Sequence, residues 1–149
     1  MSDHIRYVPT RAGFFMVLRQ GDNVFDCLDS MMRDETVPSA VIVGFGFVGT
    51  ATFGFFDFIK KEYRPRTFND LELTNLTGTL AWKDGKPAIH AHAVASNANF
   101  ETFGGHVLGL VVGRGSLEIG ISVMPMRLER VLDNDIGANV LQLQSSQNR

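Results

Sequence analysis

The chain has 149 residues, of which 44% are hydrophobic and 20% charged, a composition typical of a soluble globular domain rather than a disordered, coiled-coil or collagen-like chain. Lys and Arg total 14 and Asp and Glu total 16, and the resulting net charge of −2 argues against a general electrostatic grip on nucleic acid. A single cysteine cannot form an intrachain disulfide, and we find neither a signal-peptide pattern nor an apolar run of membrane-spanning length. We therefore expect a cytoplasmic protein without a membrane partner.

The first predicted elements are a short strand and a helix. Residues 14–18 form an apolar run, and Gly21 then separates it from Asp22, a residue suited to cap a helix N-terminus. The apolar residues that follow have the spacing of one helical face: Val24, Phe25, Leu28, Met31 and Met32. Cys27 lies beside this stripe, so we interpret it as a small buried side chain, the alternative being a catalytic nucleophile.

The rest of the chain alternates apolar or β-branched runs with tight turns. The apolar phase changes from odd to even positions near Asn75, which predicts a β-bulge, and Asp84-Gly85 predicts a hairpin turn. Gly113-Arg-Gly115 is expected to separate two strands. The segments with strand character are 39–43, 50–59, 71–82, 88–95, 106–112 and 117–124. We therefore predict an α+β fold, a single domain with a mostly antiparallel or mixed β-sheet and one main helix.

Two motifs are compatible with either a binding or a structural role. Gly44-Phe-Gly46-Phe-Val-Gly49 matches the dinucleotide-binding fingerprint, but that fingerprint requires a following helix, and the residues that follow are β-branched and aromatic. We interpret these glycines as a sharp turn or bulge in a strand. In a second motif Tyr63 is surrounded by four cations: Lys60, Lys61, Arg64 and Arg66. Cations interleaved with an aromatic residue can bind along a phosphate backbone, and the simpler interpretation is a solvated hairpin tip.

Three of the four histidines fall on two neighbouring predicted strands. His90 and His92 are two residues apart, so both rings point to one side of a strand, with Cα atoms about 6.6 Å apart. His106 follows two glycines at the start of the next strand and returns beside them if the strands pair. Three neutral imidazoles make a site for zinc or another divalent metal, with one coordination position open for water or a small-molecule ligand. The spacing leaves one alternative, histidines hydrogen-bonded to the backbone and to each other.

Two carboxylates are candidates for acid–base chemistry beside such a metal. The residues flanking Glu118 along its strand, Leu117 and Ile119, share an apolar face, so the side chain of Glu118 points to the opposite face. Glu72 lies in the strand segment that precedes the predicted bulge. Each is either a catalytic or metal-supporting carboxylate or an ordinary surface or interface residue.

Several segments resemble the plants-and-prokaryotes-conserved (PPC) domain family, in its prokaryotic single-domain branch. The most specific is Ala88-Ile-His-Ala-His92 followed by Gly104-Gly-His106, which resembles the family's H-x-H…GGH signature. Three further segments resemble its helix entry, a strand with its turn, and a second strand: Arg19-Gln-Gly-Asp22, Ala40-Val-Ile-Val-Gly-Phe-Gly46 and Leu71-Glu-Leu-Thr-Asn-Leu-Thr-Gly78. The resemblance covers about residues 13–143, which leaves residues 1–12 as an N-terminal extension and 144–149 as a disordered tail.

The resemblance implies a homotrimer that holds a metal with His90, His92 and His106, and a fold distantly similar to that of acetolactate decarboxylase, a zinc enzyme. Prokaryotic members are often labelled predicted DNA-binding proteins because plant members carry AT-hooks. The nearest fragment in this chain, Arg64-Pro-Arg66, lacks the glycine of such a hook. Three hypotheses follow. The first is a homotrimeric zinc-binding domain of unknown substrate, open to lyase or hydrolase-like chemistry. The second is a DNA-binding or regulatory module without catalysis, and the third is a scaffold whose histidines only order a loop.

Overall fold

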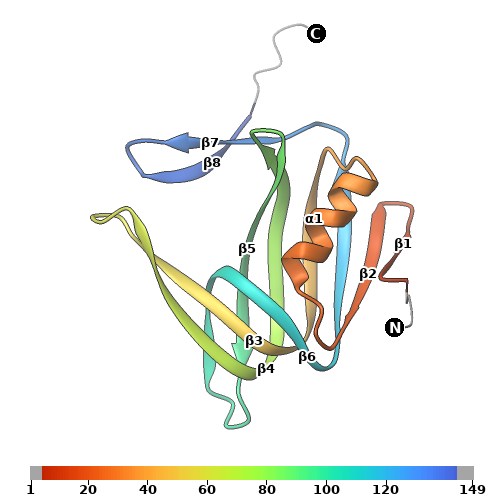
Figure 1. Ribbon diagram of the computed structural model, residues 1–149, viewed down its shortest axis with the longest axis vertical. Helices are drawn as coiled ribbons and strands as arrows, with labels where there is room; N and C mark the ends of the chain where they lie inside the picture. The colour runs from red at the N-terminus through yellow and green to blue at the C-terminus, as the bar shows by residue number, and fades with distance from the viewer. Residues whose placement is uncertain (1–4, 144–149) are drawn as a thin grey trace, which may run out of the picture.

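The computed structural model describes residues 5–143, which form one helix and eight strands (Figure 1). The elements are, in chain order, β1 (Tyr7–Pro9), β2 (Gly13–Arg19), α1 (Val24–Asp34), β3 (Ser39–Asp57), β4 (Glu62–Lys83), β5 (Lys86–Ser96), β6 (Thr102–Met124), β7 (Glu129–Asp133) and β8 (Ala138–Gln142). Of the expected extension, Tyr7–Pro9 is an edge strand paired with β2. Residues 144–149, the expected tail, lie outside the described residues.

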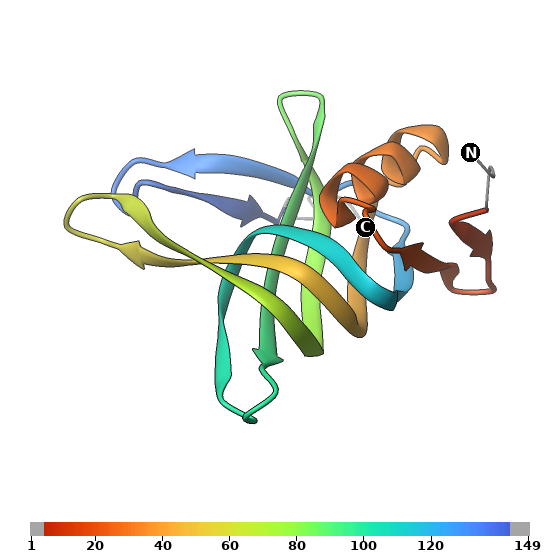
Figure 2. The ribbon, with the colours of Figure 1, turned by 60° about the horizontal axis from the view of Figure 1, so that its bottom comes forward.

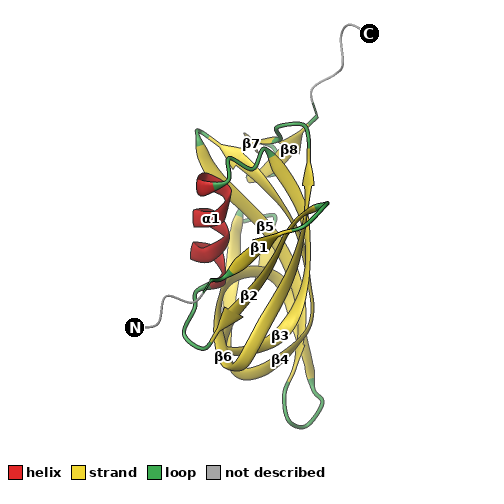
Figure 3. Cartoon of the chain, turned by 90° about the vertical axis from the view of Figure 1, so that its right-hand side faces the viewer, coloured by secondary structure: helices red, strands yellow, loops and turns green. Residues whose placement is uncertain are grey.

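The strands form one highly curved sheet. Seven strands follow the order β1-β2-β6-β3-β4-β7-β8, and β5 pairs with both β4 and β6. Because β3 also pairs with β4 and β6, the four strands β3 to β6 close into a ring, and Figures 2 and 3 show how they curl around each other. The pairings are antiparallel except that of β4 with β7. The predicted single α+β domain with one helix is confirmed.

Helix α1 covers one side of this sheet (Figure 3). The predicted cap was one residue off: the side chain of Asn23, not Asp22, accepts hydrogen bonds from the backbone N–H groups of Phe25 and Asp26. The Asp22 carboxylate instead accepts from the backbone of Arg19 and pairs with Arg6, which ties the helix entry to the edge strands. The 11-residue α1 is the only helix found in residues 5–143, and it is too short to span a bilayer.

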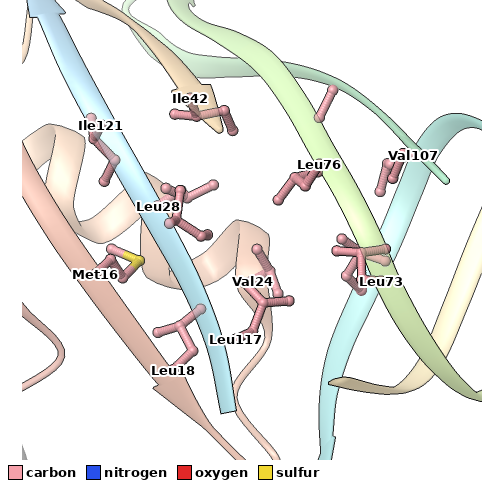
Figure 4. Close-up of a cluster of buried hydrophobic side chains, with 14 of the residues drawn as sticks. Met16, Leu18, Val24, Leu28, Ile42, Leu73, Leu76, Val107, Leu117 and Ile121 are labelled. Atoms are coloured by element: carbon pink, nitrogen blue, oxygen red, sulfur yellow. The ribbon is translucent and has the colours of Figure 1, made fainter. Parts of the chain in front are cut away.

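The apolar face of α1 closes the hydrophobic core. Val24 and Leu28 belong to one buried cluster with Leu117 of β6 and Leu76 of β4, and all four side chains are fully buried (Figure 4). Burial of a leucine-sized side chain stabilises a fold by about 1.5–3 kcal/mol, so this cluster is a principal reason that the helix packs against the sheet. The helical stripe predicted from sequence is therefore the buried face, with Phe25 partly exposed at its edge.

The Gly44–Gly49 motif lies inside β3, and no helix follows it. A Cβ atom on Gly44 would stand 2.6 Å from the carbonyl oxygen of Glu118, and one on Gly46 would stand 2.3 Å from that of Ser116. The pairing register also shifts at this place. These glycines thus allow β3 and β6 to approach closely at a bulge, which confirms the structural interpretation of the motif and excludes the dinucleotide fingerprint.

Other turn predictions have mixed outcomes. The bulge near Asn75 is confirmed by a register shift between Leu73 and Asn75, and the Asp84-Gly85 hairpin is confirmed by positive φ angles of 51° and 75°. The expected break at Gly113-Arg-Gly115 is wrong, because β6 bends there without ending. Strands β7 and β8 were not predicted, since their short segments carry too few apolar residues to show a strand pattern.

Candidate metal centre

Strand pairing brings the three histidines together. His90 and His92 lie two residues apart on β5, opposite Thr79 and Thr77 of β4. On its other side β5 pairs with the start of β6, where His106 is the direct partner of His92. Directly opposite residues in an antiparallel pair share a face of the sheet, so all three rings lie on one face. The arrangement predicted from their spacing is therefore present.

The separations of the ring nitrogens suit a metal ion. The Nε2 atoms of His90 and His92 are 3.2 Å apart, and one nitrogen from each of the three rings lies within 4.8 Å of the others. Ligands at 2.0–2.1 Å in a tetrahedral zinc site are about 3.3 Å from each other. The ring centroids are 5.1–5.4 Å apart, so the rings surround one point without stacking. These histidines can therefore hold a metal ion.

The local environment favours the uncharged form of His90 and His106. Burial, together with the nearby positive charge of Arg130 and the neighbouring rings, lowers the pKa of His106 to about 4. The pKa of His90 is lowered by burial first and then by Arg130 and His92. Metal binding requires neutral imidazole, so these two residues remain competent ligands below the ordinary histidine pKa of about 6.5.

His106 is oriented by its neighbours but leaves one nitrogen unused. Its ring stacks on Tyr63 of β4, with centroids 4.3 Å apart and planes 15° apart. Its Nδ1 atom is buried and has no hydrogen-bond partner among the described residues. An unsatisfied buried nitrogen is costly unless something binds it, so the hydrogen-bonded alternative does not account for this ring. The donor set fits a metal.

The histidines open into a pocket of about 780 Å³. Its walls come from the β3–β4 hairpin and from the β7–β8 hairpin. In Figure 1 the β7–β8 hairpin lies above the β3–β4 hairpin. The wall residues are mainly aromatic or aliphatic and include Phe55, Phe56, Phe58, Tyr63, Ile89, Leu132 and Val140. A largely apolar pocket with a few convergent polar groups is the usual form of a small-molecule site.

Sequence analysis missed Arg130, the one cation buried in this pocket. Its Nη2 donates a hydrogen bond to Thr79 Oγ1 at 2.7 Å, and Thr79 is the direct partner of His90. The residues around Arg130 show no clear strand pattern in the sequence, so no local signal marked it as buried. Tyr63 was also misplaced: it belongs to the pocket wall rather than to a solvated tip.

The two predicted carboxylates do not line this pocket. Glu118 of β6 lies opposite Phe45 of β3 and Val17 of β2. Glu72 is exposed on β4 and lines a separate depression with Arg114. Within residues 5–143, the carboxylate at the histidine pocket is Glu62, which is exposed at its rim. The structure thus assembles the histidines and leaves Glu118 and Glu72 apart from them.

The pocket and its histidines are set in a fold with known relatives. The chain is 51% identical to a predicted DNA-binding protein from Ralstonia eutropha JMP134, with a TM-score of 0.90 over 93% of this chain and 96% of that one. A metal-containing protein from Archaeoglobus fulgidus is 24% identical, with a TM-score of 0.81 over 95% and 99% of the two chains. The fold alone is shared with α-acetolactate decarboxylase from Bacillus subtilis, at 14% identity and a TM-score of 0.55 over 90% of this chain and 61% of that one.

A comparison with curated proteins finds no match. The family model of the Plants and Prokaryotes Conserved domain, abbreviated PCC or PPC, matches residues 6–124, which include the three histidines and all of β2 to β6. This match covers well over half of the chain and confirms the resemblance drawn from the histidine signature. The chain belongs to the Plants and Prokaryotes Conserved domain family.

Proposed function

We propose that the protein is a homotrimeric metal-binding protein in which His90, His92 and His106 hold zinc or another divalent cation beside a small-molecule pocket. The observation that carries the proposal is the convergence of three ring nitrogens within 4.8 Å, one of the rings having a buried nitrogen without a partner. The metal-containing relative from Archaeoglobus fulgidus supports it. An all-imidazole donor set favours zinc over magnesium or calcium, which prefer oxygen ligands.

Three protein ligands leave a coordination position free for water or substrate. When bound in such a site, zinc polarises a carbonyl oxygen or lowers the pKa of a bound water. The protein's own part is to hold the three rings on one face of the sheet, with Tyr63 stacked against His106, and to surround the open side with apolar walls. This arrangement supports a lyase or hydrolase-like reaction. Glu118 and Glu72 would contribute acid–base chemistry only if subunit packing brings one of them to a neighbouring pocket.

The uncovered face of β3 supports self-association. Val41, Val43, Phe45 and Phe47 alternate along that face and are 42–59% exposed in the single chain. An apolar row of this kind on an antiparallel sheet is typical of an interaction surface. Val43 lies opposite Thr77, which lies opposite His92, so this row and the histidines share one face of the sheet. We propose that copies of the chain cover it in the trimer, at the border of the metal centre.

Metal content per chain tests the proposal. Purified protein is exposed to zinc, passed through gel filtration in metal-free buffer and analysed for metal, alongside the His90→Ala, His92→Ala and His106→Ala variants. We expect close to one zinc per chain in the wild type and a strong loss in each variant, because two imidazoles hold zinc far more weakly than three. His4→Ala is the matched control, since His4 is the remaining histidine and lies outside the described residues.

Equal metal content in all variants would refute the metal centre, as would its absence from the wild type after zinc is supplied. Circular dichroism of each variant separates loss of ligands from loss of fold. A variant that keeps its β signal and its melting transition but binds no zinc assigns the histidine as a ligand.

A second candidate function is DNA binding, which the label of the Ralstonia eutropha protein supports. The β3–β4 hairpin carries the pattern that favours it: Arg64 lies over the exposed ring of Phe55, with 5.3 Å between the guanidinium carbon and the ring centroid. Anisotropy of labelled duplexes, measured from low to moderate salt, tests this function. Binding that weakens steeply with salt and is lost in Arg64→Gln supports it, and no binding at moderate salt refutes it.

A further inference from the structure

Arg130 is a buried cation that has no counter-ion among residues 5–143. Its side chain is 7% exposed, and no carboxylate of residues 5–143 forms an ion pair with it. Nη2 is bound by Thr79, whereas Nε has no partner among the described residues. Burying an unpaired charge is expensive, and native structures normally pair it or neutralise it. Arginine stays protonated in proteins, so the unpaired charge needs another explanation.

The position of Arg130 supplies that explanation. Arg130 lines the histidine pocket and is close enough to lower the pKa of both His90 and His106. Arg130 and His106 both line this cavity, and each has a buried ring or guanidinium nitrogen without a partner among the described residues. A guanidinium binds planar two-oxygen anions best, because its N–H groups match the spacing of a carboxylate.

The pocket walls away from Arg130 indicate what the rest of a ligand would be like. Phe55, Phe56 and Phe58 of the β3–β4 hairpin and Leu132 and Val140 of the β7–β8 hairpin offer aromatic and aliphatic surface. Lys61 adds a second positive charge at the rim, and the exposed Glu62 offsets it there. A polyanion such as a nucleotide phosphate would find few further donors on these walls, whereas an apolar substituent would find several contacts.

We infer that the pocket binds a small organic carboxylate with an apolar substituent, its carboxylate held by Arg130 beside the metal-bearing histidines and its substituent against the aromatic wall. This inference rests on the proposed function in that it names the ligand class of the same site. Thr79 is then a positioning residue, because its hydroxyl holds the guanidinium from behind.

Isothermal titration of zinc-loaded protein with benzoate, benzamide and acetate tests the inference. Benzamide has the ring without the charge, and acetate has the charge without the ring. We expect benzoate to bind at least about 10-fold more tightly than benzamide, the factor that one lost charge-assisted hydrogen bond produces. Benzoate should also bind more tightly than acetate, which lacks the contacts of the ring with the apolar wall. In Arg130→Gln the preference for benzoate over benzamide should disappear, and in Arg130→Lys it should be partly kept.

Arg127→Gln is the matched control, because Arg127 is three residues away, pairs with Glu129 and does not line the pocket. It should bind benzoate as the wild type does. If Arg130→Gln fails to fold, Thr79→Val replaces it: the cavity is preserved, the guanidinium loses its hydrogen-bonded support, and benzoate affinity should fall several-fold with zinc content unchanged.

The two proposals fail in different ways. Zinc-loaded wild type that binds benzoate and benzamide equally, or an Arg130→Gln variant that keeps the benzoate preference, overturns the carboxylate site and leaves the metal centre standing. If the wild type binds no zinc, the metal centre is refuted and the titration is repeated on metal-free protein. An Arg130-dependent preference for benzoate then still supports the carboxylate site, and no such preference overturns it as well.

Discussion

Gly78→Ala adds one methyl group at a close contact between β4 and β5, the strand that carries His90 and His92. Gly78 of β4 lies opposite Ala91, between the histidines of β5. A Cβ atom at this position would stand 2.3 Å from the carbonyl oxygen of His90 and 2.9 Å from the Cα of Ala91. Both neighbours are backbone atoms, so the clash cannot be relieved by a side-chain rotation.

The contact between the added Cβ atom and the His90 carbonyl determines how much stability and zinc affinity the variant should lose. The carbonyl of His90 must retreat by about 0.7 Å to reach 3.0 Å, the least separation that Cβ atoms tolerate. Overpacking of this kind costs about 1–3 kcal/mol of unfolding free energy. The displaced carbonyl belongs to His90, one of the proposed ligands, and metal sites tolerate errors of only about 0.2 Å in ligand distance. We therefore expect zinc affinity to fall by roughly 10- to 100-fold, the loss typical of disturbed ligand support.

Two measurements check this prediction: urea unfolding of the metal-free protein and competition for zinc with a chromophoric chelator. Gly109→Ala is the matched control, because Gly109 is also a strand glycine, of β6, and a Cβ atom there would meet nothing within 4 Å. That variant should keep wild-type stability and zinc affinity. A Gly78→Ala protein with the same unfolding midpoint and zinc affinity as Gly109→Ala would refute the packing argument.

Three further perturbations test the core, the protonation of the site and the assembly. Leu117→Ala removes a fully buried side chain and should lower the unfolding free energy by about 3 kcal/mol, measured by urea unfolding. For metal-free protein, the unfolded chain takes up a proton at His106 near pH 6.5 and the folded chain only near pH 4. The melting temperature should therefore fall as the pH is lowered from 6.5 to 4, and it should fall more steeply in the wild type than in His106→Ala. Equal slopes of melting temperature against pH in the two proteins would contradict this. Val43→Glu puts a charge on the apolar row and should give the 16.5 kDa monomer in light scattering, whereas Val8→Glu on the edge strand should keep three times that mass.

The parts of the fold that could be predicted depend on local chemistry. The stripe from Val24 to Met32 has helical spacing whatever surrounds it, and Asp84-Gly85 favours positive φ by itself, so both were found. The continuity of β3 through Gly44–Gly49 depends instead on close contact with β6, more than 60 residues away in the chain. Glycines suit a loop and a tight strand pair equally well, and only the partner strand decides between them.

The histidine cluster could likewise be predicted from local spacing, whereas the burial of Arg130 depends on a distant contact. Two imidazoles at alternate positions of one strand share a face by geometry alone. The third joins them if the next strand pairs with the first, so nearly the whole cluster could be predicted from the sequence. Arg130 reaches the pocket because the backbone N–H of Trp82 donates to Leu128 and thereby holds the start of β7 against β4. That contact leaves no periodic pattern in the sequence. A charged residue in an unrecognised short strand is indistinguishable from a surface residue until its burial is seen, and here its burial without a counter-ion is what points to an anionic ligand.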